Sequence, residues 1–323
     1  MPRYRERDVQ GKAGSRKRRF ADFCGHYGEK YAAGSSTSLL TTPVLRWRQE
    51  NVCYDQIIVT DTSNPLHKGN TQRVQFLLFL LITFGASWIL WIPLLVPSFI
   101  ELLPLGGIGL MSTVAFGPMF GALAVVPSRR ITIGNWFAKR LRFRVGLLPY
   151  LLAFGLPVAI MTVAGVLFAA LGGEPLSDAP YLLVLPVVFA YATLIGGGQE
   201  EIGWRGIAQP LAEGRYGVFI GGAVVGLFWV LWHLPLFLSS TLPFDSINPI
   251  VFGFQTVGIS VLLAWLYHCS GQSVLLTMMF HGWRNSIEAF YSTDTLARSI
   301  AVVVIWAVVR IVAAVGHRRA GHR

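Results

Sequence analysis

The apolar stretches of this sequence are too long and too numerous for a soluble protein. From Val74 onward, runs long enough to cross about 30 Å of hydrocarbon recur with short breaks between them. Only 13% of the 323 residues are charged, whereas a soluble domain carries roughly 25%. The sequence therefore predicts an all-α polytopic membrane protein and excludes the soluble globular, disordered and fibrous classes. We expect about eight transmembrane helices, at residues 74–96, 108–126, 146–171, 181–212, 218–236, 250–268, 274–290 and 299–316.

Positive charge gathers in only some of the links between these segments. The link at residues 127–145 carries six Lys and Arg residues and no acid. The links at 97–107, 172–180, 237–249 and 291–298 together carry five acids and one basic residue. By the positive-inside rule, both termini and the basic link lie in the cytoplasm, and we expect the membrane to be a bacterial plasma membrane. The same rule accounts for the net charge of +11, so we expect no nucleic-acid partner.

By composition the chain divides into three parts. Residues 1–73 form a basic polar tail that we expect to be disordered, residues 74–316 form the membrane domain, and residues 317–323 form a short basic cytoplasmic end. Three scattered cysteines, without a Cys-x-x-Cys pair, favour neither a disulfide framework nor a cysteine-based metal site. Within the basic link, apolar residues at helical spacing predict a short helix on the inner membrane surface: Ile133, Trp136, Phe137 and Leu141.

Two adjacent acids, Glu200 and Glu201, stand inside an apolar run. An ionisable residue within a membrane span is costly and therefore marks a candidate functional site. Glu201 precedes Arg205 by four residues, which is the favourable order for an ion pair on a helix. Glu200 lies about 100° around the helix and lacks that partner, which suits a general base. The alternative, that both acids only pair with basic residues of neighbouring helices, is weakened by the scarcity of such residues at this depth.

Two histidines, His233 and His281, also lie within apolar segments. A single histidine in a membrane span is often only a hydrogen-bonded packing residue, but two of them together with a pair of glutamates are harder to explain in that way. Asn285 follows His281 by four residues, so both side chains project from one face of a helix. Trp229 precedes His233 by four residues and could form an apolar wall beside it.

These side chains, gathered in a low-dielectric cavity, would permit hydrolysis by water. Glu200 would take a proton from water, His233 would orient that water, and His281 with Asn285 would hold the oxyanion. Alternatively, Glu200, His233 and His281 could bind zinc or another divalent metal. The sequence lacks a His-Glu-x-x-His pattern, and we favour a site that requires no metal cofactor. No Ser or Cys is placed beside a histidine as a covalent nucleophile would be.

The spacing of these residues resembles the signature of the CAAX-processing and bacteriocin-processing (CPBP) family of intramembrane proteases, also called the ABI or type II CAAX prenyl protease family. The resemblance rests on three ordered motifs and covers roughly residues 76–316: Glu-Glu-x-x-x-Arg at Glu200–Arg205, aromatic-x-x-x-His at Trp229–His233, and His-x-x-x-Asn at His281–Asn285. The second motif departs from the family pattern, because Trp229 stands where the family usually has Phe. The aromatic wall is kept, so the resemblance still implies an active enzyme.

The resemblance implies a glutamate-type endopeptidase, once described as a metalloprotease, that cuts membrane-anchored peptides or proteins from the cytoplasmic side. It implies that Glu200 is the base, His233 a water-orienting partner, and His281 with Asn285 the oxyanion holders, while Glu201, Arg205 and Trp229 are supporting residues. Two other functions stay open at this point. One is a non-catalytic immunity or assembly factor in the membrane, and the other is a proton-coupled transporter.

Overall fold

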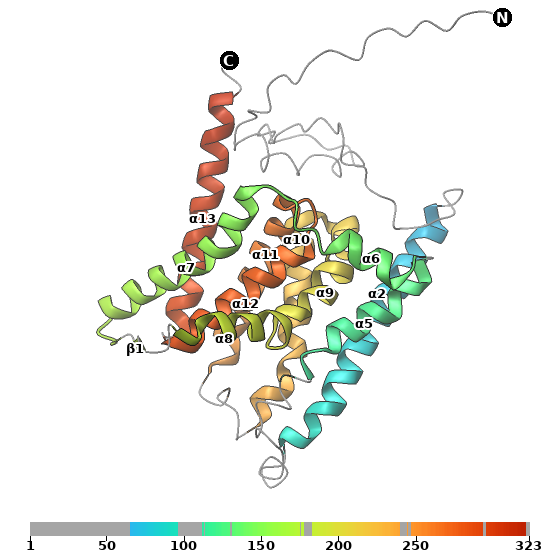
Figure 1. Cartoon of the computed structure of the whole chain (residues 1–323), viewed down its shortest axis with the longest axis horizontal. Coiled ribbons are helices and arrows are strands. Elements are labelled where there is room, and N and C mark those ends of the chain that lie inside the picture. Colours follow the sequence, from blue (N-terminus) through green and yellow to red (C-terminus); the bar gives the residue numbers. More distant parts are fainter. Residues whose placement is uncertain are drawn as a thin grey trace, which may run out of the picture.

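In a computed structural model, the described residues are 65–95, 112, 114–129, 131–174, 176–177, 183–239, 244, 247–292 and 295–320. They form a bundle of helices, which confirms the all-α polytopic architecture (Figure 1). The helices are α2 (Pro65–Trp91), α5 (Gly117–Val125), α6 (Ile133–Arg140), α7 (Leu147–Ala170), α8 (Leu185–Leu194), α9 (Glu201–Gly203), α10 (Gln209–Trp232), α11 (Pro249–Cys269), α12 (Val274–Phe290) and α13 (Thr295–Ala320). Two short antiparallel strands, β1 (Leu176–Ser177) and β2 (Tyr291–Ser292), pair at one end of the bundle.

Four helical stretches within the described residues are long and apolar enough to cross a membrane. They are Gly69–Trp91, Leu147–Ala170, Leu185–Leu238 and Pro249–Cys269. The third is 54 residues long and covers the fourth predicted segment from Leu185 onward and all of the fifth. The helix α2 begins at Pro65, ahead of the expected start at Val74. Most of the tail, the 97–107 link and residues 321–323 lie outside the described residues.

The predicted segment 181–212 is not one continuous helix. The helix α8 ends at Leu194, and the chain then bends through three glycines. The last of them begins the short 3-10 turn η4 (Gly198–Glu200), which leads into α9. A π-helical turn, η5 (Trp204–Ala208), then leads into α10. Such π-turns are rare and occur often at functional sites. Inside α10, Gly217 has a φ of 75°, which breaks the helix at the expected turn.

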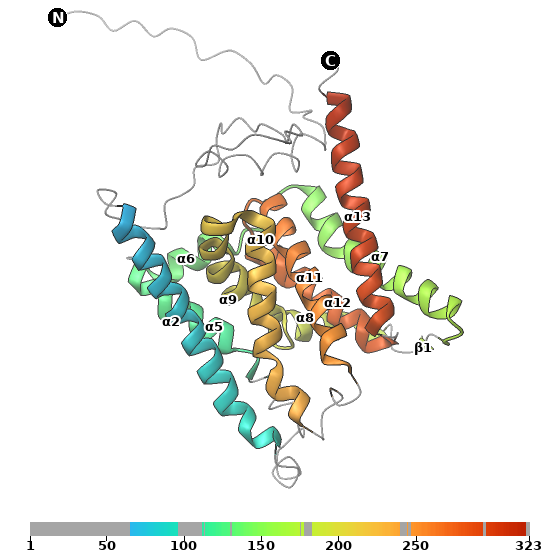
Figure 2. The ribbon, with the colours of Figure 1, turned by 180° about the vertical axis from the view of Figure 1, so that it is seen from behind.

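The bundle has two distinct ends, visible in both ribbon views (Figures 1 and 2). At the α6 end, the side chain of Gln75 from α2 donates to Ser128, and Arg140 of α6 donates to Tyr267 near the end of α11. At the opposite end, which we call the strand end, lie β1, β2 and the beginnings of α11 and α13. The short helix expected in the basic link is therefore present, and it is hydrogen-bonded to α11 at one end of the bundle.

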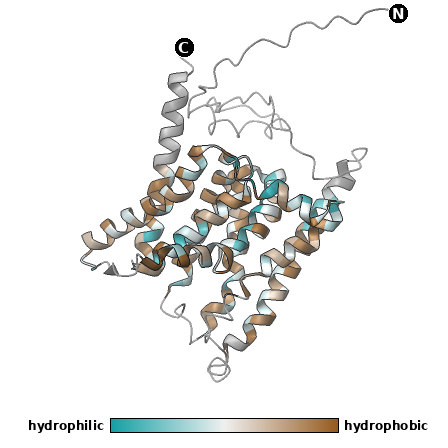
Figure 3. Cartoon of the chain, in the orientation of Figure 1, coloured by the Kyte–Doolittle hydropathy of each residue, from teal (hydrophilic) through white to brown (hydrophobic). Residues whose placement is uncertain are grey.

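Close contact between α10 and α11 depends on small residues. A Cβ atom on Gly222 would come within 2.8 Å of the Ala264 Cβ, and one on Gly226 within 2.9 Å of the Ser260 Cβ. Such small residues let membrane helices approach until their backbones nearly touch. Figure 3 shows hydrophobic residues along the long helices and hydrophilic ones at α6 and inside the bundle. The polar residues of the interior belong to the site described next.

Candidate active site

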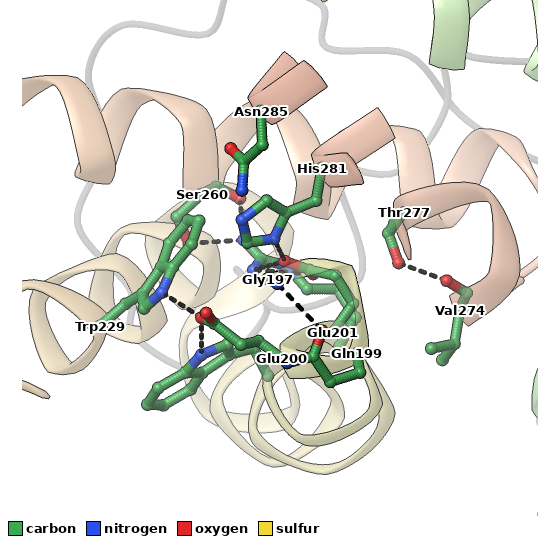
Figure 4. Close-up of polar contacts among 12 residues, drawn as sticks. Gly197, Gln199, Glu200, Glu201, Trp229, Ser260, Val274, Thr277, His281 and Asn285 are labelled. Carbon is green, nitrogen blue, oxygen red and sulfur yellow. Dashed lines mark hydrogen bonds and ion pairs between the residues drawn. The ribbon is translucent and has the colours of Figure 1, made fainter. Parts of the chain in front are cut away.

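Glu200 is a buried carboxylate held by two tryptophans (Figure 4). The indole nitrogen of Trp229 donates to Glu200 Oε2 at 2.8 Å, and that of Trp204 lies 3.4 Å from the same oxygen. Among the described residues, no Lys or Arg forms an ion pair with Glu200, as its place on the helix predicts. The carboxylate therefore faces the cavity with a fixed orientation and without a cation to neutralise it.

Glu201 is buried beside a cation. Arg205 Nη1 lies 2.9 Å from Glu201 Oε2, and this ion pair has the predicted spacing of four residues. The Nη2 atom of Arg205 donates to both the carbonyl and the hydroxyl oxygen of Ser260, at 2.9 and 2.8 Å. The guanidinium also lies over the ring of Trp229, 5.4 Å from its centroid. The pair thus ties the turn that carries both glutamates to α11.

The second partner of Glu201 is His281, a contact that the sequence did not predict. His281 Nδ1 lies 2.9 Å from Glu201 Oε1, so the ring donates to the carboxylate and is oriented by it. This contact leaves Nε2 as the free ring nitrogen. Asn285, one turn further along α12, donates from Nδ2 to the Gly196 carbonyl oxygen at 3.0 Å. The helix α12 is thus hydrogen-bonded to the segment that carries the glutamates.

Only glycine fits at position 197, between the glutamates and α12. Its φ of 126° lies in a region that other residues avoid. A Cβ atom there would come within 2.7 Å of Asn285 Nδ2 and 2.9 Å of His281 Nε2. The bend through the three glycines therefore lets the backbone approach both side chains.

His233 ends α10 and lines the same cavity as Glu200. Its Nδ1 lies 2.7 Å from the carbonyl oxygen of Trp229, and because a carbonyl can only accept, Nδ1 carries the hydrogen. In the neutral ring, Nε2 is then an acceptor that could bind a hydrogen of water. The wall expected from Trp229 is present, since its ring centroid lies 6.0 Å from that of His233 and 5.2 Å from that of His281.

One cavity of about 250 Å³ brings these residues together. Glu200, His233, His281 and Asn285 all line it, so the four predicted catalytic side chains share one space. The remaining lining residues come from the half of the bundle at the strand end: they include Trp91 at the end of α2, Phe252 and Gln255 early in α11, and Thr295 and Arg298 at the start of α13. The cavity therefore lies in the half of the molecule away from α6.

This position of the cavity brings the expected membrane orientation into conflict with the expected side of cleavage. If the basic link is cytoplasmic, as its charges predict, the cavity lies in the outer half of the membrane. The resemblance implies cleavage from the cytoplasmic side instead. The side from which residues at the two ends of the bundle can be labelled decides between them.

The sequence missed three features of this site. The indole donors of Trp204 and Trp229 were not expected, although Trp204 follows Glu200 by four residues, which was a usable signal. The bond between Glu201 and His281 joins residues 80 positions apart and left no local signal. The charged residues Arg284, Glu288 and Arg298 line the cavity but were not among the candidates.

The zinc alternative requires Glu200, His233 and His281 to converge as ligands. Within the part of the chain that the structure describes, no three His, Cys, Asp or Glu side chains are arranged to hold a metal ion. The Nδ1 atoms of both histidines face protein oxygens, and Glu200 Oε2 accepts from Trp229. The atoms left to bind a metal would be the two Nε2 atoms and Glu200 Oε1.

Comparison with known proteins agrees with the three motifs. Residues 182–287 match a family model described as type II CAAX prenyl endopeptidase Rce1-like. CAAX prenyl protease 2 of Methanococcus maripaludis is 29% identical over 103 residues, which cover 30% of this chain and 37% of that protein. The matched region runs from the start of α8 into α12 and contains all four cavity residues singled out above. The region that carries these residues is therefore similar to the type II CAAX prenyl endopeptidases.

Proposed function

We propose that this protein is an intramembrane endopeptidase that hydrolyses peptide bonds of membrane-associated substrates with a water activated by Glu200. The observation that carries the proposal is the arrangement around Glu200. Its carboxylate is buried, has indole donors but no cation, and shares a cavity with His233, His281 and Asn285. A related protein is named CAAX prenyl protease 2, which supports the reaction class.

The reaction follows from the free atoms of the site. Glu200 accepts a proton from water while the water oxygen attacks the carbonyl carbon of the scissile peptide bond. His233 Nε2 accepts the second hydrogen of this water and so orients it. The oxyanion that forms is held by the side-chain amide of Asn285 and by the Nε2–H of His281. Because Nδ1 of this ring donates to Glu201, the step uses the His281 ring with a hydrogen on both nitrogens. Collapse of the intermediate breaks the C–N bond, and the amine leaves with the proton from Glu200.

This sequence of steps needs no metal ion, and we propose that none is required. Elemental analysis of active protein tests this point. Near-stoichiometric zinc that is lost in His233→Ala, with activity abolished by a chelator and restored by zinc, would replace the water-activating glutamate with a metal centre.

The substitution Glu200→Gln tests the catalytic assignment. It keeps the size of the side chain but removes the base, so turnover of a membrane-peptide library should fall at least about 100-fold. The matched control is Glu174→Gln, which neutralises an exposed acid outside the cavity and should leave turnover unchanged. Comparable turnover in wild type and Glu200→Gln, with both proteins folded, would remove Glu200 from the mechanism.

A further inference from the structure

Beyond the four catalytic candidates, the cavity contains a second charged cluster that the proposed mechanism does not use. It consists of Arg284 and Glu288 on α12 and Arg298 in the first turn of α13. Arg284 follows His281 by three residues, so it stands about 4.5 Å further along the helix axis, toward the strand end. The cluster therefore borders the catalytic groups on one side only.

The two guanidinium groups of this cluster share a single carboxylate. Arg284 Nη2 donates to Glu288 Oε1 at 2.6 Å, and Arg298 Nη1 lies 3.4 Å from the same oxygen. Arg298 Nη2 donates to the hydroxyl of Thr295 at 3.0 Å, a neutral partner. Within the described residues, the Nε atoms of both arginines are buried without a hydrogen-bond partner. The two cations and one anion of this cluster carry a net charge of +1.

An unbalanced positive charge is costly where most of the cavity wall is apolar. Aromatic and aliphatic side chains form much of that wall, among them Trp91, Leu236, Phe244, Ile247 and Phe252. In such surroundings a guanidinium is stabilised by an anion, and a planar carboxylate matches its fork of N–H donors. The arginine side chains are about 15% exposed, so they are open to a group that enters the cavity.

We propose that Arg284 and Arg298 form a subsite that binds a carboxylate group of the substrate. This inference rests on the proposed function, because it assigns the occupant of the cavity to a peptide substrate. The carboxylate belongs either to the C-terminus of the peptide or to an Asp or Glu side chain. In both cases it lies on the strand-end side of the scissile bond, and Glu288 competes with it for the same two cations.

Binding to an inactive variant tests this subsite without any turnover. In Glu200→Gln protein, the fluorescence of the cavity tryptophans Trp91, Trp229 and Trp232 would report binding of three probes. The probes are decanoyl-Ala-Leu-Ala with a free carboxylate, the same peptide as an amide, and decanoyl-Ala-Asp-Ala amide. We expect at least one carboxylate probe to bind about ten-fold or more tightly than the uncharged amide. The probe that shows this preference identifies the terminal or the side-chain carboxylate.

Two further substitutions should change this preference in opposite directions. Adding Arg298→Gln removes one cation and should abolish the preference for a carboxylate, while adding Glu288→Gln removes the competitor and should enlarge it. The matched control, Arg144→Gln, removes an exposed positive charge outside the cavity and should leave the preference unchanged. If Arg298→Gln fails to fold, Glu288→Gln decides alone.

Equal binding of all three probes, or a preference that Glu288→Gln does not enlarge, would overturn the subsite. The proposed function is tested separately by turnover. If the inactive variant prefers carboxylate probes but the wild-type protein cleaves no peptide, the peptidase is contradicted and the subsite is kept. If the wild-type protein cleaves peptides but no carboxylate preference is found, the subsite is contradicted and the peptidase is kept.

Discussion

Among the single side chains of the site, Trp229 has a role that phenylalanine could not fill. The family pattern usually has Phe at this position, and an aromatic wall was all that the sequence predicted. In the structure the indole nitrogen donates to Glu200 Oε2 at 2.8 Å, while the ring packs against His281. The tryptophan therefore both encloses the cavity and holds the carboxylate of the proposed base, which makes it a positioning residue.

The substitution Trp229→Phe separates these two roles. It keeps the ring but removes a hydrogen bond to a charged group, which contributes about 1.5–3 kcal/mol, so kcat should fall roughly 10- to 100-fold. Because the wall is kept, KM should change little. The comparison variant Trp232→Phe alters another cavity tryptophan, and no hydrogen bond joins its indole nitrogen to a described residue. A normal kcat in Trp229→Phe would show that the hydrogen bond does not matter for catalysis.

Among the helices, α6 packs against the π-turn that follows the glutamates, and two buried arginines lie in and beside it. A Cβ atom on Gly206, in the π-turn after the glutamates, would come within 2.8 Å of the Trp136 ring of α6. Next to it, Arg129 and Arg140 are both buried, and in the described part of the chain neither has an acidic partner within ion-pair distance. Burial, and then the positive charge of Arg140, lower the pKa of Arg129 to about 10.

This lowered pKa predicts that Arg129→Met stabilises the protein. The folded state holds the Arg129 proton less tightly than the unfolded chain does. The charge of Arg129 therefore destabilises the folded state at neutral pH. This destabilisation decreases only as the pH rises through about 10, where the folded protein releases the proton. Replacing the charge by an apolar side chain of similar length should raise the melting temperature in neutral detergent by a few degrees. Arg144→Met, at an exposed position, should leave it unchanged. A lower melting temperature for Arg129→Met would indicate an anionic partner.

In the molecule as a whole, the cavity and the basic link lie at opposite ends. Arg140 donates to Tyr267 at the end of α11, whereas the cavity is lined by residues from the start of the same helix. The end of the bundle that faces the cytoplasm therefore decides from which side a substrate reaches Glu200.

Single cysteines introduced into a cysteine-free background would test this orientation in intact cells. From the positive-inside rule, we expect position 135 in α6 to react with a membrane-impermeant maleimide only after the cytoplasmic face is opened. Positions 176 in β1 and 295 at the start of α13 should react from outside. The reverse pattern would refute the charge analysis and would place the cavity in the cytoplasmic half.

The sequence by itself determined the membrane class, the helical bundle and the residues that carry the chemistry. These features are local in the sequence: the length of the apolar runs, the pairing of Glu201 with Arg205 four residues later, and the same spacing between His281 and Asn285. In a helix, residues four positions apart lie on the same face, so these pairs follow from the sequence directly. Only the tertiary structure decided how those faces meet. It broke the segment 181–212 at Gly197, joined Glu201 to His281 across 80 residues, and placed Arg284 and Arg298 around Glu288. Such contacts depend on how closely helices distant in sequence approach, and in this protein that approach is set by small residues and packing between α8, α10, α11 and α12.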